Sequence, residues 1–502
     1  MVAKARARRH TLLIAPTGGG KTLAGFLPSL IDLAARPRRR NRPAGVHTLY
    51  VSPLKALAAD VRRNLLTPVE EMGLRIRIEA RTGDTSVSRR QKQKVSPPDI
   101  LLTTPEQIAL FCAWPGARDW FSDLDTVILD EIHALHGNKR GDLLNLGLAR
   151  LQSFAPDLRR VGLSATVDDP DVLRRWLVPQ TRDDGRETRD ERFGGGDEET
   201  SARRSLASRS ATLPDDSSLV SRSSSLGLAD LVLGAPGAAP VIDVLLSEER
   251  VPWSGHTARH AMAEVLEAIR GARLALIFVN TRFQAELAFQ TLWAMNDDNL
   301  PIALHHGSLA AEQRRRVEAA MAEGRLRAVV CTSTLDLGID WGEVDLVIQL
   351  AAPKGSSRLV QRIGRANHRL DEPSRALLVP ANRFEVLECQ AAREAVADND
   401  LDGEPERVGA LDILAQHVMG VACGEPFDMQ ALYDEVTACA PYRHVTWAEW
   451  EDVVDLVSTG GYALRTYDRF KRILQGPDGL WRARDGFAAQ RHRLNLGAII
   501  DY

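Results

Sequence analysis

The chain has 502 residues, enough for about three domains with cores of their own, and its 44% hydrophobic and 26% charged residues indicate a globular protein. No apolar stretch approaches membrane-spanning length, and the N-terminus lacks the apolar core of a signal peptide, so we expect a cytoplasmic protein without membrane contact. The net charge of -3 and five scattered cysteines without a C-x-x-C pair argue against a uniformly basic surface, a zinc site and a disulfide framework. A locally basic channel for nucleic acid is compatible with this charge.

A phosphate-binding loop is predicted near the start of the chain, between Thr11 and Thr22. An apolar run ends at Ala15, which takes the place of the usual opening glycine, and three glycines and Lys21 follow. This pattern is typical of a buried strand that leads through a phosphate loop into a helix. Glycine lets the backbone turn closely around phosphates, Lys21 adds a positive charge, and Thr22 offers an oxygen to Mg²⁺. The residues expected to bind nucleotide here are Thr17, Gly18, Gly19, Gly20, Lys21 and Thr22.

Residues 1–178 alternate short apolar strands with helical segments, which predicts a parallel sheet covered by helices on both faces. The strands are expected at residues 12–15, 48–52, 75–80, 100–103, 127–130 and 160–163. Ligands bind beyond the carboxyl ends of such strands, and polar segments follow four of them, at residues 52–55, 103–106, 130–133 and 164–166.

Two adjacent carboxylates, Asp130 and Glu131, follow the fifth of these strands. Beside a phosphate loop, Asp130 fits the acid that holds Mg²⁺, and Glu131 fits the general base that activates the attacking water. His133 and the 164–166 segment could hydrogen-bond to each other and relay the state of the nucleotide to the surface.

Residues 179–250 are rich in charged residues, glycine and serine, so we expect a low-complexity, disordered insertion or linker without a catalytic role. Residues 251–400 predict a second α/β domain without a phosphate loop, with strands near residues 274–279, 301–305, 328–332, 346–350 and 376–379. Its arginine-rich loop at residues 361–369 can reach across a cleft and neutralise charge that develops on a nucleotide bound by the first domain. Hydrolysis would then depend on closure of the cleft.

Residues 401–502 are mainly helical, with helices expected at residues 408–423, 429–438 and 447–458 and a strand signal at 460–464. Three helices and a terminal hairpin suggest a winged-helix module of the helix-turn-helix class. A helical packing domain that only supports the cleft fits the same pattern.

The motifs, in this order, resemble those of superfamily 2 DEXH-box helicases of the large-helicase-related group, especially its ligase-associated bacterial type. They are APTGGGKT, SPLKALAAD, TTPE, DEIH, SAT, FVNTR, HHGSL, TSTLDLGIDWG and QRIGRANHR. The resemblance implies an α/β fold of two tandem RecA-like P-loop domains with a C-terminal, mainly α winged-helix domain. It also implies ATP and Mg²⁺ as cofactors and movement along single-stranded DNA, 3′-to-5′, with strand separation and a role in DNA repair. The implied partners are single-stranded or forked DNA, RNA as an alternative, and a DNA ligase and nuclease of repair.

Carried over to this sequence, the resemblance gives roles to residues of both domains. In the first domain, Lys21 and Thr22 would hold phosphate and magnesium, while Asp130 and Glu131 would act as magnesium acid and base. In the second domain, Arg365 would meet the γ-phosphate side of ATP. The other residues implied on the nucleotide side of this domain are Gln361, Arg362, Gly338 and Asp340. Those implied along the nucleic-acid backbone, which would read phosphate and sugar rather than base, are Pro53, Lys55, Thr104, Arg282, His306 and Thr332.

Three features depart from the family pattern. Only ten residues precede Thr11, without the adenine-reading glutamine of such helicases, and the family continues beyond the winged helix, so we expect a chain truncated at both ends. His368 replaces the final arginine of the last motif, which leaves Arg362 or Arg369 as a second arginine finger. Two other functions therefore stay open: a duplex translocase that does not separate strands, and a nucleic-acid-binding scaffold with weak ATPase.

Overall fold

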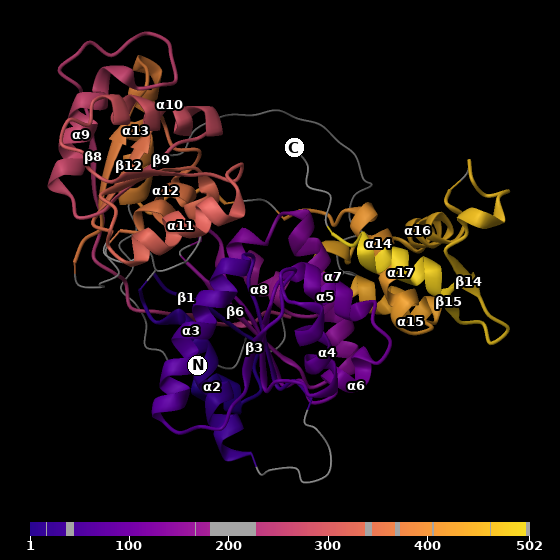
Figure 1. Cartoon of the computed structure of the whole chain (residues 1–502). Coiled ribbons are helices and arrows are strands. Elements are labelled where there is room, and N and C mark those ends of the chain that lie inside the picture. The colour runs from indigo at the N-terminus through magenta and orange to yellow at the C-terminus, as the bar shows by residue number, and fades with distance from the viewer. Residues whose placement is uncertain are drawn as a thin grey trace, which may run out of the picture.

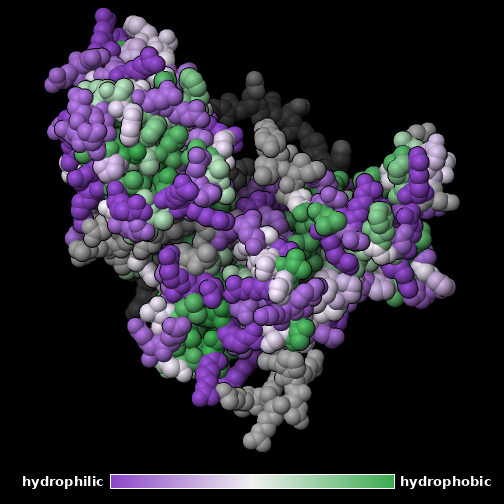
Figure 2. Space-filling view, viewed as in Figure 1, coloured by the Kyte–Doolittle hydropathy of each residue, from purple (hydrophilic) through white to green (hydrophobic). Residues whose placement is uncertain are grey.

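The computed structural model describes residues 1–16, 18–36, 45–165, 167–180, 227–336, 344–366, 372–403, 406–461 and 463–497. Two α/β domains and a smaller, mainly helical domain make up the chain, and the helical domain packs beside the first α/β domain (Figure 1). The face seen in Figure 2 is mostly hydrophilic, with hydrophobic patches on both α/β domains. None of the helices within the described ranges is both long and apolar enough to cross a bilayer.

Domain 1 is built on a seven-stranded sheet with the strand order β3-β4-β2-β5-β6-β1-β7, and every neighbouring pair is parallel. The strands are β1 (Thr11–Ile14), β2 (Thr48–Val51), β3 (Ile78–Ala80), β4 (Ile100–Thr103), β5 (Thr126–Leu129), β6 (Arg159–Ser164) and β7 (Asp230–Leu233). The helices are α1 (Val2–Arg6), α2 (Lys21–Ala35), α3 (Lys55–Glu71), α4 (Val87–Val95), α5 (Pro105–Cys112), α6 (Ala117–Phe121), α7 (Lys139–Phe154) and α8 (Pro170–Leu177), with a 3₁₀ turn at Ile132–Ala134.

The central strands of domain 1 are buried along their whole length, because helices cover both faces of the sheet. This explains why β1, β2, β4 and β5 appear in the sequence as continuous apolar runs rather than as alternating patterns. The parallel arrangement brings the carboxyl ends of β1, β5 and β6 to one edge, where the phosphate loop, the acid pair and Ser164 follow.

Domain 2 contains a six-stranded parallel sheet with the order β10-β11-β9-β12-β13-β8. The strands are β8 (Val241–Val244), β9 (Ala275–Phe278), β10 (Ile302–His305), β11 (Ala328–Cys331), β12 (Leu346–Leu350) and β13 (Arg375–Val379). The helices are α9 (Met262–Gly271), α10 (Arg282–Ala294), α11 (Ala311–Ala322), α12 (Ser356–Ile363) and α13 (Arg383–Ala397), with 3₁₀ turns at Arg259–Ala261 and Ser333–Leu335.

The expected linker over residues 179–250 needs a correction at its C-terminal end. Residues 181–226 lie outside the described part of the chain, but β7 pairs with β1 in the first sheet and β8 pairs with β13 in the second. Each is the edge strand of its sheet, so residues 230–244 contribute one strand to each α/β domain.

The C-terminal domain consists of α14 (Leu411–Gly424), α15 (Met429–Thr437), α16 (Trp447–Thr459), an antiparallel ribbon of β14 (Ile473–Gln475) and β15 (Trp481–Ala483), and α17 (Gly486–Leu494). The strand expected at residues 460–464 is wrong: Gly460 and Gly461 have φ of 81° and 84°, which ends α16 in a turn, and the ribbon begins only at Ile473.

The C-terminal domain is fixed to domain 1 by a shared hydrophobic core and by buried charge. Leu143 and Leu146 of α7 pack in the same cluster as Leu414 and Val418 of α14. Arg150 of α7 also binds Glu435 Oε2 at 3.0 Å, and both side chains are buried at this contact. The two domains are therefore expected to move together.

Candidate functional site: a nucleotide site shared by two domains

The predicted phosphate loop connects β1 to α2 at the carboxyl edge of the first sheet. Gly18 and Gly20 have φ of 80° and 70°, in the left-handed region that glycine adopts without strain. A Cβ on Gly19 would meet the carbonyl oxygen of Pro16 at 3.0 Å, so this position also disfavours a side chain. The backbone can therefore approach a phosphate chain closely, at the N-terminus of α2.

Lys21 and Thr22 are the first two residues of α2. Lys21 Nζ donates a hydrogen bond to the carbonyl oxygen of Ala15 at 2.9 Å, and the side chain is buried, so its charge is held beside the loop. Thr22, at the next position, is half-buried. Thr17, which we also predicted to bind nucleotide, lies outside the described residues.

Asp130 follows β5 directly and is buried. Its Oδ2 accepts a hydrogen bond from the Tyr50 hydroxyl, and its Oδ1 accepts one from the backbone N–H of Glu131 at 2.9 Å. Burial and the charge of Glu131 raise the pKa of Asp130, while the Tyr50 hydrogen bond and the charge of Lys21 oppose them. A cation bound at this carboxylate would, like Lys21, stabilise its ionised form. Asp130 is therefore well placed to hold a cation.

Glu131 is buried and adopts φ of 47°, unusual for a residue other than glycine. Burial alone would raise the pKa of Glu131, but the nearby His133, Lys21 and Arg365 outweigh it and lower the pKa. Glu131 is therefore the more acidic member of the acid pair and is ionised at neutral pH. That is the state that a general base requires.

His133 connects Glu131 to the end of β6. Its Nε2 lies 3.3 Å from Glu131 Oε2, and its Nδ1 lies 2.8 Å from Ser164 Oγ, which confirms the predicted contact between His133 and the 164–166 segment. Thr166 lies outside the described residues. Burial lowers the pKa of His133, although the charge of Glu131 opposes this, and the imidazole connects Glu131 to Ser164 through its two ring nitrogens.

Arg365 is the part of the site that domain 2 supplies. It lies just beyond the end of α12 and is only 2% exposed. Burial lowers its pKa, and the negative charges of Glu131, Asp336 and Asp130, which are near enough to interact with its guanidinium, oppose this. Its Nε and Nη1 are buried, and neither has a hydrogen-bond partner among the described residues. Such an unsatisfied donor group, held between two domains, fits an anionic ligand that enters the cleft.

Arg362, predicted to bind nucleotide, has other partners. Its Nε donates to Asp336 Oδ1 at 2.9 Å, its Nη1 donates to Gln349 Oε1 at 2.5 Å, and its guanidinium lies 4.8 Å from the centre of the Phe278 ring. These contacts are all within domain 2 and occupy the guanidinium. We therefore correct the prediction: Arg362 holds α12 on its sheet, and Arg365 is the arginine whose charge interacts with the acid pair of domain 1.

A cavity of about 710 Å³ lies between the two α/β domains, next to this site. His133 and Asp168 line it from domain 1, and Gln361 and Arg358 line it from domain 2. Gln361 therefore lines the space between the two domains, and its contact with nucleotide stays a prediction. Gly338, Asp340, His368 and Arg369 lie outside the described residues.

The residues predicted to follow the nucleic-acid backbone are dispersed over both domains. In domain 1, Lys55 is exposed and binds Asp84 Oδ1 at 2.9 Å, the carbonyl oxygen of Pro53 accepts from Arg140 at 2.8 Å, and Thr104 is buried before α5. Lys55 therefore presents an exposed charge, whereas Pro53 and Thr104 are buried, and contact of all three with nucleic acid stays a prediction.

In domain 2, Arg282 is exposed at the start of α10. His306 is buried, with its Nδ1 accepting from the Ser308 N–H at 3.2 Å and its Nε2 at 3.5 Å from Glu286 Oε1, which is close but beyond a good hydrogen bond. Thr332 is also buried, directly after β11. Of the three, only Arg282 presents an exposed charge.

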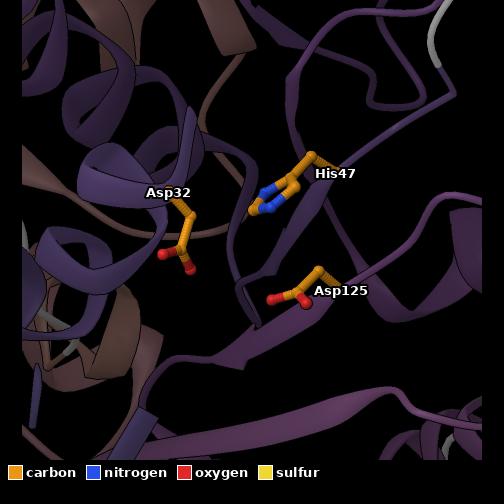
Figure 3. Close-up of side chains that lie close together, drawn as sticks. All are labelled: Asp32, His47 and Asp125. Atoms are coloured by element: carbon orange, nitrogen blue, oxygen red, sulfur yellow. The ribbon is translucent and has the colours of Figure 1, made fainter. Parts of the chain in front are cut away.

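A group of potential metal ligands lies elsewhere in domain 1. Figure 3 shows Asp32, His47 and Asp125 pointing toward one another. His47 and Asp125 precede β2 and β5, so the group lies at the opposite edge of the sheet from the phosphate loop. Arg8 donates to Asp125, and burial with the charge of Arg36 lowers the pKa of His47 to about 4. These arginines disfavour a cation, so this group is no alternative to the magnesium site.

Two residues of the site escaped the sequence analysis. Tyr50 lies inside the apolar run of β2, where a fully buried tyrosine indicates that its hydroxyl has a partner, here Asp130. Asp336 lies in the TSTLDLGIDWG motif and anchors Arg362, but nothing in the sequence identifies this pairing.

Each of the three domains matches a known protein family. The DEAD/DEAH box helicase family matches residues 1–174, the helicase conserved C-terminal domain matches residues 258–369, and the winged helix domain of large helicase-related proteins matches residues 394–502. The Lhr helicase/probable uracil glycosylase of Mycolicibacterium smegmatis is 33% identical over 98% of this chain and 32% of its own length. The ATP-dependent helicase Lhr-Core of Methanothermobacter thermautotrophicus is 32% identical over 98% of this chain and 54% of its own. The chain belongs to the large helicase-related family.

The solved structures agree with this assignment. The Mycobacterium smegmatis helicase Lhr bound to ssDNA and AMP-PNP has a TM-score of 0.78 at 33% identity, over 99% of this chain and 59% of that one. The DUF1998 helicase MrfA bound to DNA shares the fold, with a TM-score of 0.67 at 19% identity over 98% of this chain and 60% of that one. The large helicase-related fold of two RecA-like domains and a winged helix is thereby confirmed, and the helical packing domain is set aside. The chain spans between 32% and 54% of the length of the two curated relatives named above.

Proposed function

We propose that this chain is an ATP-dependent nucleic-acid helicase that moves 3′-to-5′ along single-stranded DNA and acts in DNA repair. The observation that supports the proposal is that Arg365 of domain 2 is buried, has two donor atoms without partners among the described residues, and interacts with the charges of Asp130 and Glu131 in domain 1. A site completed by residues of two domains responds to their separation, so hydrolysis and domain movement are coupled. The relatives named above support the class of activity, and the ssDNA in the solved Lhr structure supports the choice of strand.

The residues present fit a magnesium nucleotide. The glycine loop leaves room for phosphate, which a Cβ at Gly19 would restrict. Lys21 supplies a buried positive charge. Nε and Nη1 of Arg365, which have no partner among the described residues, can donate hydrogen bonds to an anion. Thr22 and Asp130 are the residues that would hold Mg²⁺. When bound, the metal neutralises charge on the phosphate oxygens.

Lys21, Glu131, Arg365 and His133 then have separate roles in hydrolysis. Lys21 binds and orients the phosphates, and Glu131, kept ionised by its neighbours, takes a proton from the water that attacks the γ-phosphate. Arg365 stabilises the negative charge that develops on the transferring group, provided the cleft is closed. His133 contacts both Glu131 and Ser164, so it orients Glu131 and can transmit a change at Glu131 to the end of β6.

The proposal is tested by ATP hydrolysis with and without single-stranded DNA, followed by unwinding of forked duplexes with either a 3′ or a 5′ tail. We expect DNA-stimulated hydrolysis and unwinding of the 3′-tailed fork. Stimulation without unwinding, together with displacement of a triplex strand, would identify a duplex translocase instead. Absence of stimulation by DNA or RNA would identify a binding scaffold.

A further inference from the structure

We infer that domain 2 carries a base-stacking platform for single-stranded nucleic acid, formed by Trp253, Phe283 and Phe384 around Arg383. The inference rests on the proposed function and extends it, because none of these aromatic residues belongs to the motifs discussed above. Their side chains are 64%, 70% and 64% exposed, respectively. Three large aromatic side chains left in water on one part of a domain mark a binding surface.

Backbone and side-chain hydrogen bonds bring the three aromatic residues together. Arg383 N–H and Nε donate to the carbonyl oxygens of Pro252 and Val251 at 3.0 and 3.2 Å, which fixes the loop carrying Trp253 to the start of α13. Gln284 Nε2 donates to the carbonyl oxygen of His256 at 2.7 Å, which fixes the other end of the same loop to the start of α10. The loop over residues 251–256 is therefore held between two helices that both lie in the upper part of domain 2 in Figure 1. These hydrogen bonds fix the backbone positions from which the aromatic side chains extend.

The chemistry of the platform favours a nucleic-acid strand. The guanidinium of Arg383 lies 4.3 Å from the centre of the Trp253 ring, so a cation sits against one face of the indole. Arg282, the exposed cation predicted to contact the phosphate backbone, is the residue before Phe283. Aromatic faces next to arginines are the combination that binds unpaired bases and their phosphates without sequence preference. A protein partner would not need this alternation of rings and positive charge.

The platform also continues the surface predicted to bind nucleic acid. Glu286, one turn along α10 from Arg282, lies 3.5 Å from His306, another residue predicted on the strand path. Arg282 and Phe283 are exposed in the first turn of α10, and Gln284 in the same turn binds the loop that carries Trp253. A strand that follows Arg282 would meet the aromatic rings next.

The test compares binding of a fluorescent twelve-nucleotide thymidine strand with an abasic strand of the same length. Trp253→Ala should weaken binding of the thymidine strand by about tenfold to 100-fold, which is the usual contribution of one stacked base, and leave the abasic strand unchanged. Trp253→Phe, which keeps an aromatic face, should restore most of the affinity. Trp293→Ala is the matched control, because Trp293 is 59% exposed on the same helix, α10, about 16 Å from Arg282 at the other end.

Each outcome distinguishes the platform from the proposed function. If wild-type protein binds neither strand, the proposed function fails and the platform with it. If wild type binds but Trp253→Ala binds the thymidine strand equally well, the platform alone is refuted. Equal loss on both strands would also refute stacking, since an abasic strand has no base to lose.

Discussion

Replacing Arg365 by alanine tests whether domain 2 completes the nucleotide site. The side chain is 2% exposed, and Nε and Nη1 have no partner among the described residues, so its removal breaks no hydrogen bond at these atoms and relieves the desolvation of a buried charge. The thermal midpoint of the variant should therefore stay unchanged or rise slightly, while nucleotide binding is retained.

The expected loss in turnover follows from electrostatics. A guanidinium about 4 Å from a phosphoryl oxygen, at the effective dielectric constant of a partly buried site, contributes about 4 kcal/mol. That energy corresponds to a loss of about 10³-fold in kcat, at the lower end of the effects of arginine fingers. The assay is steady-state hydrolysis at saturating ATP and single-stranded DNA. Wild-type turnover by Arg365→Ala would refute the two-domain site.

Two arginines on the same helix provide controls. Arg362→Ala leaves Asp336 without its main partner and should destabilise domain 2 by about 3–5 kcal/mol, visible in its melting curve. Arg358 is half exposed, with its Nε 3.8 Å from Asp336 Oδ2, so Arg358→Ala should change stability by less than about 1 kcal/mol. A low turnover in all three variants would indicate damage to α12 rather than loss of a finger.

Three further predictions follow from the contacts in domain 1 and the winged helix. Glu131→Gln should bind ATP normally but lose hydrolysis by about 10²–10⁴-fold, because the amide cannot accept the proton; comparable turnover in single-turnover assays would exclude Glu131 as the base. Ser164→Ala removes the hydroxyl at 2.8 Å from His133 and should leave basal hydrolysis intact while reducing unwinding per ATP; unchanged coupling would argue against the relay. Burial, with Arg150 and His492, lowers the pKa of His417 to about 3, so this residue stays neutral when folded but takes up a proton below about pH 6.5 when unfolded. Stability should thus fall by about 2 kcal/mol between pH 6.5 and 5 from this group, and His417→Gln should reduce that slope in urea titrations; an unchanged slope would contradict the assignment.

Much of the fold could be predicted because the central strands are short apolar runs followed by polar motifs. β7 and β8 were missed for the opposite reason: as edge strands they are only partly buried, and they follow a long polar segment without periodicity. Their pairing partners, β1 and β13, are more than a hundred residues away in sequence, and local pattern carries no information about such contacts.

Prediction of the site from the sequence is limited in the same way. The sequence indicated that arginines after β12 approach the nucleotide. It does not show which of Arg362 and Arg365 does so, because both are arginines of the same short segment. Asp336 and Gln349 bind the first, whereas the second lies beyond the end of α12 and interacts with the charges of Asp130 and Glu131. The aromatic platform gave no signal in the sequence, because the segments that carry Trp253, Phe283 and Phe384 are joined only by tertiary hydrogen bonds.

The claim that one catalytic site spans both α/β domains is tested most directly by a double-mutant cycle in kcat between Glu131→Gln and Arg365→Ala. If base and finger act together in one transition state, the double variant should lose about as much activity as the more damaged single variant. Losses that simply multiply would mean that the two residues act independently, and would contradict a shared site.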